Sequence, residues 1–350
     1  MRKSEGRPRH RRTGHAELFA ACLVALTAAT LPCFATLAGG LLALAGAGTV
    51  VRAGPAVWQP SPGHTQVPIW PGTPPDQPSM PGPESVRQMA VANVTRPTMT
   101  LYAPRGKNTG VAIVVLPGGG FQILAMDLEG AEICDWLTAR GVTCVLLKYR
   151  VPSVPYVWRC DCRPDNHSLS TPSLEDVQRT LRLVRAHAAE WSIDPHKVGV
   201  IGFSAGGFLA AEASTYFEER LYAPVDAADG LSSRPDFAIA LYPGHLSMAK
   251  DSTALNPVIA SHVTARTPPT FLLQNEDDHV DRVEDALSYY MGLKKAGVPV
   301  ELHAYAQGGH AFGLREHRLP VAGWPRLVET WLHTIGMLGL SRADAGRSAS

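Results

Sequence analysis

The sequence predicts an α/β protein with a doubly wound, mostly parallel sheet and helices on both faces. Two continuous apolar runs, 111–116 and 142–147, lack the alternation of a half-exposed strand and indicate strands that are buried on both faces. Strand patterns and helix patterns alternate along the chain, which is typical of parallel sheets with crossover helices. The chain has 350 residues, 45% of them hydrophobic, so a core can form without disulfides or metal.

Each expected element has a local signal. The helix at 128–140 ends at Gly141, and the helix at 173–191 opens with a capping box from Ser173 to Asp176. The first two strands are expected to form an antiparallel edge. The expected strands are 85–94, 98–102, 111–116, 142–147, 197–203, 236–241, 270–273 and 300–305, and the expected helices are 128–140, 173–191, 205–217, 281–295 and 325–338.

The first 52 residues differ in charge from the rest of the chain. They carry seven basic and two acidic residues, a net charge of +5, which leaves −4 for the remainder of a chain whose total is +1. The basic start leads into 18–51, which holds no charged residue. This pattern predicts an export signal, cleaved near Ala45, Ala47 or Ala53, and a periplasmic or secreted protein. The alternatives are a membrane anchor through 18–51 or a wrongly assigned start.

The chain divides into four expected segments. Residues 1–53 form the signal peptide or anchor, and 54–84 form a Pro-rich lead-in, which cannot be helical and whose Trp58 and Trp70 dock against the body. Residues 85–340 form one α/β domain, and 341–350 form a disordered tail. No stable membrane association is expected once the leader is cleaved.

Four cysteines lie beyond the leader, namely Cys134, Cys144, Cys160 and Cys162. An exported body permits disulfides, but four cysteines allow three connectivities and the sequence does not choose among them. No further ligand lies at the spacing of a zinc site. The body is mildly acidic and has no basic stripe, so nucleic acid is not an expected partner.

A serine stands at a predicted strand-to-helix turn. Ser204 lies in Gly-Phe-Ser-Ala-Gly-Gly, which follows an apolar strand and opens an Ala-rich helix. Such a turn strains the serine and exposes its hydroxyl above the sheet, and the helix N-terminus behind it favours developing negative charge. The sequence therefore predicts that Ser204 is a nucleophile.

A serine nucleophile needs a general base and a carboxylate that orients the base. His310 is the expected base because it follows a strand through a flexible Gly-Gly turn, while His245 is a candidate for lining the site. Three consecutive carboxylates follow strand 270–273. They are Glu276, Asp277 and Asp278. Asp277 is the preferred partner of His310 because of its D-x-x-V spacing, in which Val280 would anchor the loop in the core. Asp278 and Glu276 remain alternatives.

The loop at 117–121, Pro-Gly-Gly-Gly-Phe, is a candidate oxyanion hole. Glycines leave backbone N–H groups open to close approach, and the N–H of Ala205 would supply another donor. The loop lacks the Lys-Ser/Thr of a phosphate loop and the spacing of a dinucleotide motif.

Residues 111–338 resemble the α/β-hydrolase superfamily, and most closely the secreted esterase branch related to acetyl-xylan and feruloyl esterases and to hormone-sensitive-lipase-like enzymes. The resemblance implies Ser204 as nucleophile, Asp277 as acid and His310 as base; the implied oxyanion donors are Gly119, Gly120 and Ala205. Pro117 departs from the histidine of the lipase-like relatives.

The resemblance implies a serine carboxylic-ester hydrolase that works through an acyl-enzyme and needs no cofactor. Its expected substrates are small-molecule or oligosaccharide esters, such as acetylated or feruloylated carbohydrate. A prolyl-oligopeptidase-type serine peptidase and a non-enzymatic binding module are the alternatives. The segment 151–171 resembles an extra loop, either a wall of the site or a surface excursion.

Overall fold

The central sheet has eight strands and confirms the predicted α/β class. The computed structural model describes residues 57–77, 82–87, 90–151, 167–249, 251–315 and 318–339. The strands, in spatial order, are β1 (Gln66–Pro68), β4 (Thr98–Tyr102), β7 (Thr143–Lys148), β5 (Ala112–Leu116), β8 (Val198–Phe203), β9 (Ala238–Leu241), β10 (Thr270–Asn275) and β11 (Val300–Tyr305). Strand β4 runs antiparallel to β1 and β7, and the remaining pairs are parallel.

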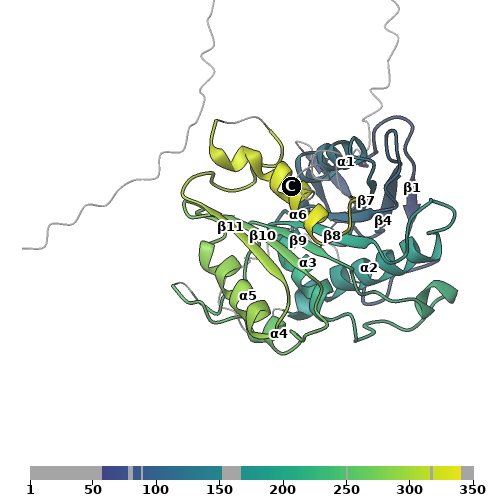
Figure 1. Ribbon diagram of the computed structural model, residues 1–350. Helices are drawn as coiled ribbons and strands as arrows, with labels where there is room; N and C mark the ends of the chain where they lie inside the picture. Colours follow the sequence, from purple (N-terminus) through teal and green to yellow (C-terminus); the bar gives the residue numbers. More distant parts are fainter. Residues whose placement is uncertain are drawn as a thin grey trace, which may run out of the picture. The chain divides into compact units, whose positions relative to one another are not determined.

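Helices cover both faces of this sheet (Figure 1). On one face α1 and α6 meet through Trp136 and Trp324, whose ring centroids are 5.3 Å apart. On the other face α2 packs on α3, α3 packs on β8 and β9, and α5 packs on β10 and β11. The helices are α1 (Glu132–Thr138), α2 (His167–Ala186), α3 (Ala205–Thr215), α4 (Pro257–Ala260), α5 (Val283–Lys295) and α6 (Trp324–Thr334).

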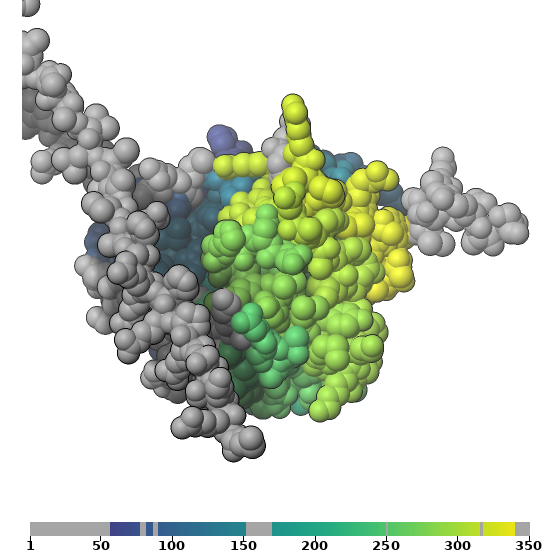
Figure 2. Space-filling view, turned by 90° about the vertical axis from the view of Figure 1, so that its left-hand side faces the viewer, coloured from purple at the N-terminus to yellow at the C-terminus, as the bar shows by residue number. Residues whose placement is uncertain are grey.

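Strand β11 forms one edge of the sheet. Figure 2 looks onto this side, where the C-terminal segments, coloured light green to yellow, make up most of the visible face. All residues of β11 are at least partly exposed, whereas every residue of the neighbouring strand β10 is buried. This difference explains why the buried strands of the sheet are continuous apolar runs and why β11 carries Glu301 and His303.

The expected strand at 85–94 is two strands, β2 (Ser85–Arg87) and β3 (Ala90–Ala92). They pair antiparallel and form a separate small sheet with β6 (Ile123–Leu124). The antiparallel edge of the main sheet is instead β1 beside β4, and β1 lies within the Pro-rich segment. Its Pro68 is compatible with this position because an edge strand has a free side that needs no N–H donor.

The predicted single helix at 128–140 has two parts in the structure. A π-helical turn, η1 (Asp127–Ala131), precedes α1. The described residues also form two short 3₁₀ turns, η3 (Ala227–Gly230) and η4 (Pro320–Gly323), and the one-turn helix α4, which the sequence pattern does not predict.

The predicted capping box of helix 173–191 is wrong, because α2 begins at His167 and continues through Pro172. Ser173 donates through Oγ to the carbonyl of Arg150 at 2.8 Å instead of capping the helix. Asp176 accepts from both the backbone and the side chain of Arg150. The guanidinium of Arg150 is fully buried, and a buried charge without a partner is strongly destabilising. Asp176 therefore pairs with Arg150 and does not cap the helix.

Two features tie the start of the described chain and α1 to the core. Trp58 and Trp70 are buried as predicted, and Trp70 donates through Nε1 to Asp176 at 2.7 Å. Cys134 in α1 and Cys144 in β7 form a disulfide, which selects one pairing among those the sequence allowed. Cys160, Cys162 and most of the predicted loop 151–171 lie outside the described residues.

Among the residues described, no helix combines the length and the apolar character that crossing a bilayer requires.

Candidate active site

Ser204 lies in the sharp turn between β8 and α3, as its flanking residues predict. Its backbone has φ +52° and ψ −121°, a strained conformation for a residue with a side chain. The turn is tight enough that a Cβ on Gly202 would lie 1.9 Å from the carbonyl oxygen of Gly206. A Cβ on Gly206 would lie 2.1 Å from that of Leu116. Glycine is therefore required on both sides of the serine.

His310 reaches Ser204 from the loop after β11. Its Nε2 lies 3.0 Å from Ser204 Oγ, and its Nδ1 lies 2.7 Å from Oδ2 of Asp278. The hydroxyl, imidazole and carboxylate thus form one chain of hydrogen bonds, which is the arrangement that lets a serine pass its proton to a base. Asp278 is buried, and His310 is partly buried.

The structure corrects the choice of carboxylate, because His310 pairs with Asp278 and not with Asp277. Asp277 Oδ1 accepts the N–H groups of Gly308 and Gly309, at 2.9 and 2.8 Å, and so holds the turn that presents His310. The D-x-x-V argument required Val280 to be a core anchor, but 67% of its surface is exposed. Asp278 Oδ1 instead closes the loop by accepting the N–H of Val280 at 2.8 Å. Glu276 is exposed.

The carboxylates around His310 favour its charged form. Burial alone would lower the pKa of His310, but the hydrogen bond that His310 donates to Asp278 and the charges of Asp281 and Asp278 outweigh it and raise the pKa above its ordinary value. An imidazolium at position 310 is therefore stabilised by the carboxylates around it.

The predicted oxyanion loop lies beside Ser204. Gly119, Gly120 and Ala205 line one cavity of about 330 Å³ together with Ser204 and His310. The N–H of Gly118 donates to Glu129 at 2.7 Å, so the first glycine of the loop is committed to holding the loop in place. The cavity lining is otherwise mostly apolar and includes Ile123, Ala125, Leu128, Val280 and Ala311.

The conformation of Gly119 is available only to glycine. Its φ is +134°, and a Cβ there would lie 2.2 Å from the carbonyl oxygen of Ile123. Gly119→Ala must displace the loop, and we expect kcat for a short-chain ester to fall about 10²–10³-fold, the loss typical of one oxyanion donor. Gly72→Ala, where a Cβ meets nothing within 4 Å, is the matched control. A Gly119→Ala enzyme with wild-type kcat would contradict the role of this loop.

Glu129 was not found by sequence reasoning. It is buried in η1, where Oε2 accepts from Gly118 and Oε1 accepts from the hydroxyl of Tyr242 at 2.8 Å. The ring of Tyr242 packs edge-on against the imidazole of His310, with centroids 4.8 Å apart. Burial raises the pKa of Glu129. The carboxyl group of Glu129 thus holds the Gly-rich loop at Gly118 and also contacts Tyr242, which packs against His310.

Asp281 is the second residue that sequence reasoning missed. Its Oδ2 accepts a hydrogen bond from Ser204 Oγ at 3.2 Å, and it lines the same cavity. Burial raises the pKa of Asp281 to about 7. His245, which the sequence suggested as a lining residue, lies with Nε2 4.0 Å from Asp281 Oδ1, and burial lowers its pKa to about 3. His245 therefore stands near Asp281 as a neutral, buried ring.

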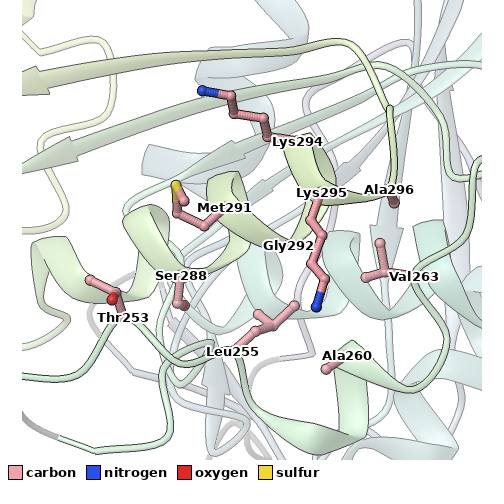
Figure 3. A pocket seen from close by; sticks show the side chains of 10 residues that line it. All are labelled: Thr253, Leu255, Ala260, Val263, Ser288, Met291, Gly292, Lys294, Lys295 and Ala296. Atoms are coloured by element: carbon pink, nitrogen blue, oxygen red, sulfur yellow. The ribbon is translucent and has the colours of Figure 1, made fainter.

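A second and larger cavity lies away from these residues. It has a volume of about 840 Å³ and is lined by residues of α4, α5 and the adjoining loops, with the amine of Lys295 pointing between Leu255 and Ala260 (Figure 3). Ser288 on its wall donates to the carbonyl of Asp285 at 2.9 Å, and the residues that line this cavity include no histidine or carboxylate. The cavity therefore lacks the serine–histidine–carboxylate arrangement of the first.

Comparison with known sequences points to esterases. The BD-FAE family model matches residues 99–241. An acetylxylan esterase from Xylanibacter ruminicola is 30% identical over 236 residues, which cover 61% of this chain and 43% of that protein. A probable carboxylic ester hydrolase, LipM, from Mycobacterium tuberculosis is 26% identical over 231 residues, covering 59% of this chain and 51% of that protein. The chain thus spans about half the length of these curated relatives.

Solved structures extend the similarity over most of the chain. An acetyl ester-xyloside bifunctional hydrolase from Caldicellulosiruptor lactoaceticus is 31% identical with a TM-score of 0.63, and the match covers 79% of this chain and 97% of that one. Esterase 2 from Thermogutta terrifontis, in its propionate-bound structure, is 26% identical with a TM-score of 0.57, and the match covers 75% of this chain and 98% of that one. The chain belongs to the α/β-hydrolase superfamily, in the esterase branch that contains acetylxylan esterases.

Proposed function

We propose that the protein is a serine carboxylic-ester hydrolase that acts through an acyl-enzyme. The observation that carries this proposal is the chain of hydrogen bonds from Ser204 through His310 to Asp278 at the wall of a small apolar cavity. The esterases among its relatives support the same reaction and favour it over the peptidase alternative.

In this mechanism His310 removes the proton of Ser204 while the serine oxygen attacks the ester carbonyl. The negative charge that develops on the carbonyl oxygen is stabilised by backbone N–H groups of Gly119, Gly120 and Ala205. His310 then gives the proton to the leaving alcohol, and water releases the acyl group by the reverse sequence. Asp278 holds the imidazole with Nε2 toward the serine and stabilises its charged form.

We further propose short acyl esters of carbohydrate as the substrate class, with feruloyl and other small esters as alternatives. The cavity of about 330 Å³ and its aliphatic walls suit a small acyl group. The acetylxylan esterase and the acetyl ester-xyloside hydrolase among the relatives support an acetylated sugar.

We infer that the protein is exported. The basic start and uncharged segment 18–51 favour export, and the Cys134–Cys144 disulfide is compatible with an oxidising compartment. The N-terminal residue of the protein recovered outside the cytoplasm of a bacterial host tests this inference, since a start at Met1 would contradict cleavage of the leader.

A substrate panel tests the proposed function directly. Acetylated xylan, p-nitrophenyl acetate, methyl ferulate and a prolyl peptide are compared by kcat/KM. We expect the two acetyl esters to be hydrolysed. The ratio of kcat/KM for methyl ferulate to kcat/KM for acetylated xylan decides between feruloylated and acetylated carbohydrate as the substrate class. An enzyme that cleaves the peptide but neither acetyl ester would overturn the proposal.

A further inference from the structure

The nucleophile has a second acidic neighbour that the proposed mechanism does not use. Asp281 Oδ2 lies 3.2 Å from Ser204 Oγ and 3.8 Å from Nε2 of His310. The residue is 5% exposed and lines the cavity that holds the reacting groups. Asp278 alone already orients His310 through Nδ1, so Asp281 is not needed for that task.

The fold reserves space for this carboxyl group and fixes its direction. A Cβ on Gly244 would lie 2.3 Å from Asp281 Oδ1, so a side chain there would have to displace the carboxyl group from its present position. The N–H of Asp281 donates to Asp278 Oδ1 at 3.1 Å, and its carbonyl accepts from Gln274 Nε2 at 2.6 Å. The backbone that carries Asp281 is thus held by the loop that carries the carboxylate of the triad.

The titratable groups facing Asp281 come from four elements. Asp278 lies on its own loop, Asp285 on α5, His310 on the loop after β11 and His245 on the loop after β9. Burial and the two acidic neighbours favour the neutral form of Asp281, while His310 favours the charged form. In either form the group can make a hydrogen bond to a hydroxyl, as acceptor when charged and as donor when neutral.

Asp281 competes with His310 for the single proton of Ser204. The serine hydroxyl can donate to Nε2 of His310 or to Oδ2 of Asp281, but not to both. Only the first bond prepares the serine for attack. A substrate group that donates to Asp281 would replace the serine there and leave the serine proton directed at His310.

The position of such a substrate group follows from the reaction. The leaving oxygen must approach Nε2 of His310 to receive its proton, and Asp281 Oδ2 lies 3.8 Å from that nitrogen. A hydroxyl on the carbon next to the one that bears the ester therefore comes within reach of Asp281. Simple alcohols lack this hydroxyl, whereas sugars and polyols carry it.

Building on the proposed ester hydrolysis, we propose that Asp281 recognises the free hydroxyl adjacent to the scissile ester and thereby selects esters of sugars and other vicinal diols over esters of simple alcohols. A site built to bind a hydroxyl discriminates against the analogue without it, because the buried polar group is left unpaired.

A matched pair of esters tests this selection. trans-2-Hydroxycyclohexyl acetate and cyclohexyl acetate share the ring and the acyl group and differ by one hydroxyl. We expect kcat/KM of the full-length wild type to be roughly 10- to 100-fold higher for the hydroxylated ester, the range expected when one buried hydrogen bond is lost. Asp281→Ala is expected to bring this ratio close to one, and Asp281→Asn, which keeps a hydrogen-bonding side chain, to retain part of it.

The controls separate recognition from structural support. Asp285→Asn alters a neighbouring buried carboxyl group that does not line the cavity, and it is expected to keep the wild-type ratio. If Asp281 only supported the fold, Asp281→Ala and Asp281→Asn would lower both rates and leave the ratio unchanged, which would overturn the inference. A wild type that prefers neither ester would also overturn it. A wild type that hydrolyses no ester at all would instead refute the proposed function.

Discussion

Ser204→Ala is expected to lower kcat for p-nitrophenyl acetate about 10⁶-fold, the loss measured for removing the nucleophile of a serine hydrolase. The variant has no oxygen to form the acyl-enzyme, and His310 then has no bound proton donor to activate. The variant is still expected to react about 10³–10⁴-fold faster than the uncatalysed reaction in water, because the oxyanion donors and the cavity remain. Single-turnover kinetics, with a search for the acyl-enzyme by mass spectrometry, measures both the rate and the missing intermediate.

The control for this variant is Ser214→Ala, ten residues further along the chain, in the helix α3 that follows Ser204. Ser214 is buried in α3 and donates to the carbonyl of Ala210 at 2.7 Å, so its loss alters the helix without touching the reacting atoms. We expect this variant to acylate normally. An active Ser204→Ala enzyme that still accumulates an acyl intermediate would place the nucleophile elsewhere.

Asp278→Asn is expected to lower kcat about 10⁴-fold, since an asparagine at this position favours the wrong tautomer of the histidine. The same change removes the negative charge of the side chain whose hydrogen bond to His310 does most to raise the pKa of His310. His310 accepts the serine proton only when neutral, so kcat/KM of the wild type rises as pH rises through the raised pKa. In Asp278→Asn this rising limb is expected to move to lower pH.

The neighbouring residue provides a sharp control, because the two carboxylates are adjacent in sequence. Asp277→Asn keeps an oxygen that can accept from Gly308 and Gly309, and we expect its kcat to stay within about tenfold of wild type. Comparing the pH profiles of both variants decides between the two assignments. A larger loss in Asp277→Asn than in Asp278→Asn would restore Asp277 as the partner of His310.

The parts of the site that the sequence predicted depend on local structure. Ser204 could be identified because the apolar strand, the tight turn and the helix are contiguous, and the glycines at 202 and 206 are required by contacts within that turn. His310 could be identified because a strand and a Gly-Gly turn precede it. The buried strands could be found for a similar reason, since their apolar runs are continuous along the chain.

The rest depends on contacts between distant segments. The choice between Asp277 and Asp278 is set by how the loop closes on itself, and the exposed side chain of Val280 gives no pattern that would reveal it. Glu129 and Asp281 each bind partners more than 70 positions away, Tyr242 and Ser204. A carboxylate in a helical segment or a charged loop has the same local pattern as a solvated one, so sequence alone could not distinguish them.

The disulfide between α1 and β7 has a consequence for the order in which the chain is assembled. Both cysteines are completely buried, so once α1 has packed on β7 neither an oxidant nor a thiol catalyst can reach them. Oxidation must therefore come before the core closes, while the segment from the oxyanion loop to β7 is still open. A chain that completes its folding in a reducing compartment would seal two thiols inside, and later exposure to air would not join them.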